Sequence, residues 1–185
     1  MQLCWVTNER YYSKLLRWFF TDDTSHVGVT FGMDDDSVHL AVDVNRPFGK
    51  VYDLQHWLYK YTVIWSMDVN LSDDHEREMY KLCRDYCVLR QYDMPAYYFG
   101  MIAGLKLKFL HISLPTVNTW SLNTGSTCQE ILVPIVQSDV MQHIEPRLAD
   151  VDFKRFSACT PDMTMDIMKA ATKGNPRIQW RFNGG

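Results

Sequence analysis

Two short segments that alternate strictly between apolar and polar residues place the strongest limits on how this chain can fold. They span residues 26–31 and 38–44, and residues 32–37 between them are rich in turn formers. Alternation with a period of two predicts β-strands that bury one face. The short linker predicts an antiparallel hairpin. The shared apolar face comprises Val27, Val29, Phe31, Val38, Leu40 and Val42.

The opposite face of this hairpin carries a histidine and a carboxylate. If Phe31 pairs with Val38, the numbers of paired residues sum to 69, and His26 then lies directly opposite Asp43. Directly opposed residues have Cβ atoms roughly 4.5–5.5 Å apart. A carboxylate at that distance can orient an imidazole and fix its tautomer. His39 is the alternative orienting group, although this register pairs it with Thr30.

A cysteine far downstream stands at a predicted helix start. Cys128 follows Ser126 and Thr127, either of which can cap the helix, and Gln129 or Glu130 can complete a capping box. Unpaired backbone N–H groups and the positive dipole end of a helix favour the thiolate, which is the nucleophilic form of cysteine. The sequence therefore predicts a nucleophile at position 128.

These segments resemble the permuted branch of the papain-like, NlpC-type cysteine hydrolases. In that family a strand reading roughly Ser-His-Val-Gly precedes a helix reading roughly Cys-Ser-Glu-Leu-Val. Here residues 25–28 read Ser-His-Val-Gly, and residues 128–132 read Cys-Gln-Glu-Ile-Leu. Three further segments agree in order, and the resemblance covers most of the chain. They are the helix at residues 15–19, the Leu-x-x-Trp segment within 51–58, and the helix start at 159–163.

The resemblance implies an α+β, circularly permuted papain-like fold, in which a small antiparallel sheet packs against a helix bearing the nucleophilic cysteine. It implies a cysteine-dependent amide or peptide hydrolase, or an acyltransferase, that works through an acyl-enzyme. Cys128 would be the nucleophile, His26 the base and Asp43 the orienting group. Expected substrates are peptides, peptidoglycan stems or acyl lipids.

Three further residues are expected to bind substrate. Ser25 and Thr127 each precede one of the reactive residues, and Tyr92 belongs to a Tyr-Asp pair that resembles one in the family. The Tyr-Asp pair has a second interpretation, in which it only begins a turn before Pro95.

Composition narrows the remaining possibilities. A chain of 185 residues with 46% hydrophobic residues fits one domain, here residues 1–173, followed by a loose tail at 174–185. A net charge of −3 predicts no nucleic-acid partner, and no apolar run is long enough to span a membrane. Five cysteines without an export signal predict reduced thiols in the cytoplasm, or in the host cytoplasm if a phage encodes the chain.

Neither a metal nor a cofactor is expected. Cys83 and Cys87 lie on the apolar stripe of a helix that begins after Ser72, so they are interpreted as core thiols and not as metal ligands. The acidic triplet at 34–36 lacks the other ligands of a calcium loop. Further expectations are a helix at 97–109 and a kink or end at Pro134 in the helix that Cys128 opens.

A second class of function stays open. A non-catalytic interaction protein that kept the fold, for example one that modulates a phage host, would also carry these motifs. Gln129 in place of Ser, the aspartate at position 43 and the proline at 134 are the departures that favour this alternative. Its partner would be another protein, bound through exposed aromatic residues.

Overall fold

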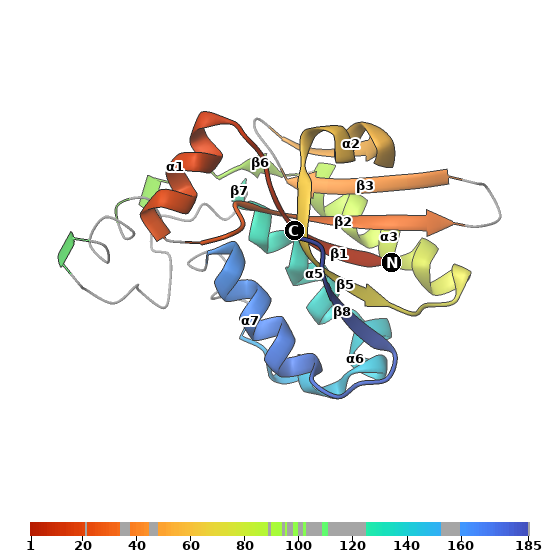
Figure 1. Cartoon of the computed structure of the whole chain (residues 1–185). Coiled ribbons are helices and arrows are strands. Elements are labelled where there is room, and N and C mark those ends of the chain that lie inside the picture. The colour runs from red at the N-terminus through yellow and green to blue at the C-terminus, as the bar shows by residue number, and fades with distance from the viewer. Residues whose placement is uncertain are drawn as a thin grey trace.

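The computed structural model describes residues 1–20, 22–33, 38–44, 48–88, 90–93, 95, 98–99, 102, 109–110, 125–152 and 160–184. Within these ranges the chain is α+β, with helices packed on an antiparallel sheet (Figure 1). The strands are β1 (Gln2–Thr7), β2 (His26–Met33), β3 (Val38–Val44), β4 (Gly49–Asp53), β5 (Thr62–Val69), β6 (Gln91–Tyr92), β7 (Gly125–Ser126) and β8 (Ile178–Phe182). The helices are α1 (Tyr11–Phe20), α2 (Leu54–Lys60), α3 (Asp73–Val88), η2 (Cys128–Ile131), α5 (Leu132–Gln137), α6 (Asp139–Ile144), η3 (Pro146–Asp150) and α7 (Pro161–Thr172).

Six strands form the main sheet in the order β4-β3-β2-β1-β5-β8, and each neighbouring pair is antiparallel. The central strand β1 is apolar at consecutive positions because it is covered on both faces. Leu3 and Trp5 face one side of the sheet, whereas Cys4 and Val6 face the other. All four side chains are fully buried.

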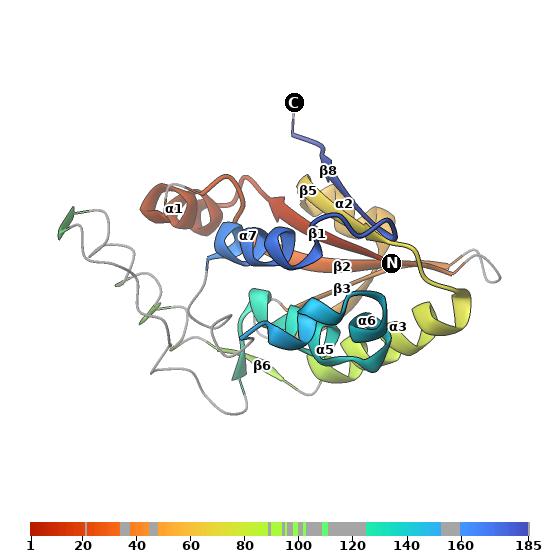
Figure 2. The same ribbon diagram turned by 90° about the horizontal axis from the view of Figure 1, so that it is seen from below.

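Helices cover the two faces of the sheet unequally. Helices α3, α5, α6 and α7 contribute to the larger core with Met79, Ile135, Met141 and Met168. The opposite face carries a smaller core, centred on Trp57 of α2. Figure 2 shows α3, α5 and α6 on one side of the sheet and α2 on the other. The candidate site residues His26 and Asp43 belong to the face that α2 covers, as their strand positions require.

The β2–β3 hairpin forms as predicted, but its register differs from the prediction. Phe31 pairs with Leu40 and Gly28 pairs with Asp43, so paired numbers sum to 71 instead of 69. The predicted direct pairing of His26 with Asp43 is therefore wrong. The reason is that β2 continues two residues further, to Met33, before the turn. Because side chains alternate with a period of two, a shift of two leaves every residue on its predicted face.

Helix α3 begins after Ser72 as predicted, and its apolar stripe is narrower than expected. Met79, Cys83 and Cys87 are fully buried, whereas Leu82 is 39% exposed. The helix approaches β4 closely at Gly49, where a Cβ atom would lie 2.4 Å from the carbonyl oxygen of Cys87. Glycine at position 49 therefore lets the helix backbone rest directly on the strand.

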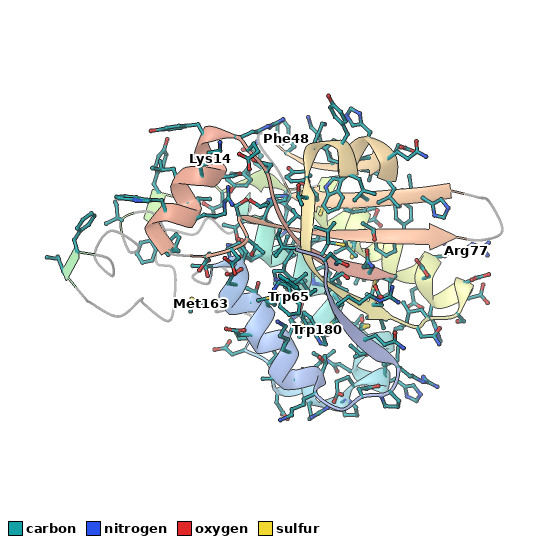
Figure 3. All side chains as sticks on the ribbon, viewed as in Figure 1. Lys14, Phe48, Trp65, Arg77, Met163 and Trp180 are labelled. Atoms are coloured by element: carbon teal, nitrogen blue, oxygen red, sulfur yellow. The ribbon has the colours of Figure 1, made fainter. Side chains whose placement is uncertain are left out.

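The segment after residue 173 is not a loose tail, which corrects the sequence prediction. Residues 178–182 form β8, which pairs with β5 at the edge of the sheet. Trp180 and Trp65 lie beside α7 (Figure 3), where the Lys169 ammonium sits 3.3 Å from the Trp65 ring centroid. The prediction failed because five residues with one buried apolar position, Ile178, give almost no period-two signal.

Two predictions fall largely outside the described residues. The acidic turn at 34–36 lies outside them altogether, and of the helix at 97–109 only positions 98, 99, 102 and 109 are described, all as helical. The predicted helix start at Thr160-Pro161 is confirmed, with the Thr160 hydroxyl accepting a hydrogen bond from the Met163 N–H. No helix in the described part of the chain combines the length and hydropathy that a bilayer crossing requires.

Truncation of the chain after Arg177 should destabilise the protein. The change removes buried Ile178 and the Trp180 ring, which packs 5.1 Å from Trp5, so we expect a loss of at least about 2 kcal/mol in unfolding free energy. Urea unfolding measured by fluorescence gives the value. Truncation after Phe182 keeps β8 and should cost under about 1 kcal/mol. Equal stabilities for the two truncations would contradict the sheet order.

Candidate functional site

A histidine and an aspartate meet on the face of the sheet that α2 covers. His26 begins β2, and Asp43 lies on β3 directly opposite Gly28, two residues along from His26. Such diagonal neighbours are within reach of long side chains. The His26 Nε2 atom lies 3.1 Å from Asp43 Oδ2, in a contact where the ring N–H is not well aligned with the oxygen. The predicted partnership therefore exists, although the predicted cross-strand pairing does not.

The Asp43 carboxylate is fully buried, and an indole N–H holds it. Trp57 Nε1 donates a hydrogen bond of 2.9 Å to Asp43 Oδ2, the same oxygen that faces His26. The other oxygen, Oδ1, has no hydrogen-bond partner among the described residues. A buried carboxylate is costly unless it is paired and hydrogen-bonded, so these two contacts carry its stabilisation.

One aromatic ring stacks on the imidazole of His26, and a second packs against the first. The Tyr61 ring stacks on it with a centroid distance of 5.1 Å and an interplanar angle of 9°. The centroid of the Trp57 ring lies 5.1 Å from that of Tyr61, so Tyr61 contacts both the imidazole and the indole. Burial raises the pKa of Tyr61 to about 12, against a smaller lowering by the nearby His26 charge. The phenol is therefore neutral at physiological pH.

The electrostatic surroundings of His26 favour its charged form. Burial lowers the pKa of His26, but the influences that raise it, of which the negative charge of Asp43 is the largest, together outweigh burial, and the result lies well above the ordinary 6.5. The imidazolium is consequently the form that this site stabilises at neutral pH. Cys128 is among the groups that influence the pKa of His26, so the two side chains share one electrostatic environment.

Cys128 begins a helical turn, as predicted, although the turn is of a tighter type. Thr127 is the N-cap, and its backbone N–H donates a hydrogen bond of 2.5 Å to Glu130 Oε2, the reciprocal half of a capping box. Residues 128–131 form the 3-10 turn η2, which continues directly into α5. Pro134 does not end this helix, which continues to Gln137, because the proline occupies the first turn of α5, where a missing N–H breaks no helical bond.

The turn that bears Cys128 packs against β2 and β3, the strands that carry His26 and Asp43. The thiol donates a hydrogen bond of 3.2 Å to Gln129 Oε1, so the neighbouring amide contacts the sulfur itself. Cys128 is 5% exposed, less than expected for a nucleophile that reaches into a cleft. Cys83 and Cys87 are fully sealed, as predicted.

Each of the three predicted substrate-binding residues lies next to His26 or to the segment that leads into Cys128. Ser25 is buried beside His26, and its Oγ has no hydrogen-bond partner among the described residues. Thr127 is the N-cap before Cys128. Tyr92 pairs with Ser126 in the parallel ladder of β6 and β7, which places it across from the segment that leads into η2.

His39, the alternative orienting group, is excluded by position. It pairs with Gly32 and not with Thr30, and it is exposed, far along the strand from His26. Trp57 and Tyr61 are the residues of this site that sequence reasoning missed. Trp57 stands in the Leu-x-x-Trp segment, but its spacing could not show that it faces Asp43. Tyr61 carries no motif at all.

The described residues hold no group of three or more His, Cys, Asp or Glu side chains arranged to bind a metal ion. Cys83 and Cys87 point into the core, where burial raises the pKa of Cys83 well above its ordinary value and that of Cys87 to about 12. Thiols with such pKa values are poor ligands at neutral pH, because metals bind the thiolate.

Comparisons with known proteins yield little. No family model matches the chain, and no curated protein matches it. One solved structure is similar: the crystal structure of the metalloprotein yiiX (DUF1105) from Escherichia coli O157:H7. The two share 10% sequence identity over 97% of this chain and 94% of that one, with a TM-score of 0.46. A likeness of this strength carries no argument about function.

Replacement of Asp43 by Asn should lower the pKa of His26. The carboxylate is the largest influence that raises it, and burial, which lowers it, would remain. Because the folded pKa of the wild type exceeds the unfolded value, the pair stabilises the fold fully below about pH 6.5 and loses that effect as pH rises through the folded pKa. Proton NMR titration of the His26 ring and urea unfolding between pH 5 and 9 measure both effects.

The control for this experiment is Asp68→Asn, which removes a carboxylate on β5 that pairs with Arg181. It should leave the His26 titration unchanged. An Asp43→Asn protein that folds and titrates at the wild-type pKa would show that Asp43 does not set the charge of the imidazole.

Proposed function

We propose that this protein is a cysteine-dependent amide or peptide hydrolase, or an acyltransferase, with a permuted papain-like fold and a His26–Asp43–Cys128 triad. The observation that carries the proposal is the buried ion pair between His26 and Asp43, situated beside the capped turn that begins with Cys128. The resemblance of residues 25–28 and 128–132 to the family motifs supports the same assignment.

The energetics of the pair argue against a purely structural role. A buried ion pair is often no more stabilising than apolar residues of the same volume, because both charges lose their hydration. Asp43 is fully buried and His26 is only 7% exposed. A titratable group with a strongly shifted pKa, here His26, occurs preferentially at functional sites, where a defined protonation state is needed.

In the proposed reaction Cys128 and His26 act as a thiolate–imidazolium pair, in which the thiol proton resides on His26, and because Nε2 of the ring faces Asp43, Nδ1 is the ring nitrogen left for the sulfur. The thiolate attacks the acyl carbon of the substrate, and the backbone N–H of Cys128 stabilises the resulting oxyanion. The leaving amine takes the proton from His26 as its bond to carbon breaks, which leaves a thioester. Water then releases the acid in a hydrolase, and an amine or alcohol accepts the acyl group in a transferase.

The substrates we propose follow from the family resemblance: peptides, peptidoglycan stems or acyl lipids. No cofactor is part of the proposal, and the setting is the cytoplasm, or the host cytoplasm if a phage encodes the chain. Ser25, Thr127 and Tyr92 are proposed to line the acyl-binding side of the site, since each adjoins one of the reactive elements.

The second candidate is a non-catalytic interaction protein that retains this fold. The specific observations in its favour are the 5% exposure of Cys128 and the exposed aromatic residues of α1, where Tyr11 is 72% and Trp18 is 51% exposed. The two candidates differ in the reactivity of one thiol, which makes them separable by direct chemistry.

Alkylation by iodoacetamide should modify Cys128 at pH 6, where an ordinary thiol of pKa about 8.5 reacts slowly. Reaction at this pH is what the proposed nucleophile requires, because the thiolate is the reactive form. Burial raises the pKa of Cys4 to about 12 and also raises the pKa values of Cys83 and Cys87, so these thiols should stay unmodified. Peptide mass spectrometry after a timed reaction locates the label.

Three variants complete this test. His26→Gln should abolish labelling at pH 6, because it removes the imidazolium, and Cys128→Ala should abolish both labelling and capture by acyl-amide activity probes. Cys159→Ala accounts for the cysteine outside the described residues and should change nothing. Labelling at Cys128 that rises only above pH 8, as for a free thiol, would reject the enzyme and favour the interaction protein.

Stability should separate the roles of the cysteines. Cys128→Ala should cost about 1 kcal/mol or less in unfolding free energy, because the thiol lies at the start of a short turn and donates its hydrogen bond to the neighbouring Gln129. Cys83→Ser puts a hydroxyl into a fully apolar core and should cost roughly 1–3 kcal/mol. Thermal unfolding of both variants measures the difference. A reversed order would identify Cys128 as a structural residue.

A further inference from the structure

Helix α2 is built so that one aromatic side chain reaches the buried carboxylate. It follows β4 without a loop, and the Asp53 carboxylate caps it by accepting hydrogen bonds from the N–H groups of Gln55 and His56. The cap fixes where the helix begins and therefore which residue of its first turns faces the sheet. That residue is Trp57, whose side chain is fully buried.

The sheet offers the indole a slot at Gly28. This glycine lies on β2 directly opposite Asp43, between His26 and Thr30 on the same face. A Cβ atom at position 28 would lie 2.5 Å from Trp57 Cζ2, nearer than carbon atoms can approach. The indole therefore occupies the space that any side chain at 28 would fill, and from there its N–H reaches Asp43.

We propose that Trp57 is a positioning residue of the candidate site: seated in the slot left by Gly28, its indole N–H holds Asp43 Oδ2 where that oxygen faces His26. As a statement about catalysis, this inference rests on the proposed function. The arrangement of indole, carboxylate and imidazole stands on its own geometry, with contacts of 2.9 Å and 3.1 Å to one oxygen.

The hydrogen bond from Trp57 matters because Asp43 has few others. The second carboxylate oxygen has no hydrogen-bond partner among the described residues, and the His26 N–H is poorly aligned with the first. Without the indole donor, the buried carboxylate would lose its aligned hydrogen bond and would turn. Its negative charge would then act less strongly on His26.

Charged and titratable groups from four elements surround His26. Asp43 comes from β3, Cys128 from η2, Tyr61 from the residue after α2, and Tyr52 from β4. Of these, Asp43 is the strongest influence that favours the imidazolium. A change that acts through Trp57 should therefore appear at His26 even in a variant whose thiol is intact and unreacted.

The test is the NMR titration of His26 in the full chain with two changes at position 57. Trp57→Phe removes the donor, and β-(3-benzothienyl)alanine keeps the shape of tryptophan but lacks the N–H. Both should lower the pKa of His26 by about one unit or more, and should slow alkylation of Cys128 at pH 6 by about tenfold. If Trp57→Phe fails to fold, the benzothienyl variant decides the question, because it preserves packing.

Trp5→Phe is the matched control, since Trp5 is equally buried and donates its indole N–H to the Thr164 hydroxyl, 3.2 Å away. It should leave the titration of His26 unchanged. A benzothienyl variant whose His26 titrates as in the wild type would overturn the inference. A titration that responds while Cys128 shows no enhanced reactivity in the wild type would uphold the positioning role and reject the proposed function.

Glycine variants test the slot itself. Gly28→Ala should lower the pKa of His26 as Trp57→Phe does, because the new methyl group must displace the indole. In a protein that already carries Trp57→Phe, Gly28→Ala should lower the pKa of His26 little further. Gly32→Ala is the control on the same strand, where the added Cβ would meet only the His39 ring at 3.2 Å. If the changes in the His26 pKa caused by Gly28→Ala and Trp57→Phe were fully additive, the two residues would act independently. That result would overturn the proposal that Gly28 makes room for the indole.

Discussion

The candidate site depends on the burial of one carboxylate. Asp43 is sealed inside a small apolar cluster, and a single oxygen is approached by the indole of Trp57 and the imidazole of His26. In a low-dielectric setting an unpaired charge is expensive and a paired one interacts strongly. The carboxylate therefore requires both partners, and in turn it makes the imidazolium the favoured form of His26.

The larger core supports the sheet from the face opposite to the cluster around Asp43. Helices α3, α5, α6 and α7 fix one face of the sheet, and α2 alone among the described helices contributes to the cluster on the other. The turn at Cys128 links the strands of the candidate site to the larger core, since it packs on β2 and β3 and continues into α5. The proposed reactive residues thus come from parts of the chain that are separated by most of its length.

Expectations based on a long alternating pattern or on a local capping motif were more accurate than those that depend on contacts between distant residues. Period-two alternation over residues 26–31 and 38–44 correctly assigned the faces of the hairpin, but not its register, because the loop between the strands carries no signal for where pairing begins. The capping motif correctly predicted the turn that begins at Cys128, because Thr127 and Glu130 are only three residues apart and interact directly. Trp57 and β8 were missed since their roles arise from tertiary contacts.

The contact between Gly28 and Trp57 restricts how this sequence can change through evolution. A side chain at position 28 is incompatible with an indole at 57, and a smaller residue at 57 leaves a void beside a buried charge. Each single substitution is therefore harmful until the other has occurred. Among chains that share this fold, positions 28 and 57 should vary together, so that lineages are separated by a paired exchange instead of a series of tolerated intermediates.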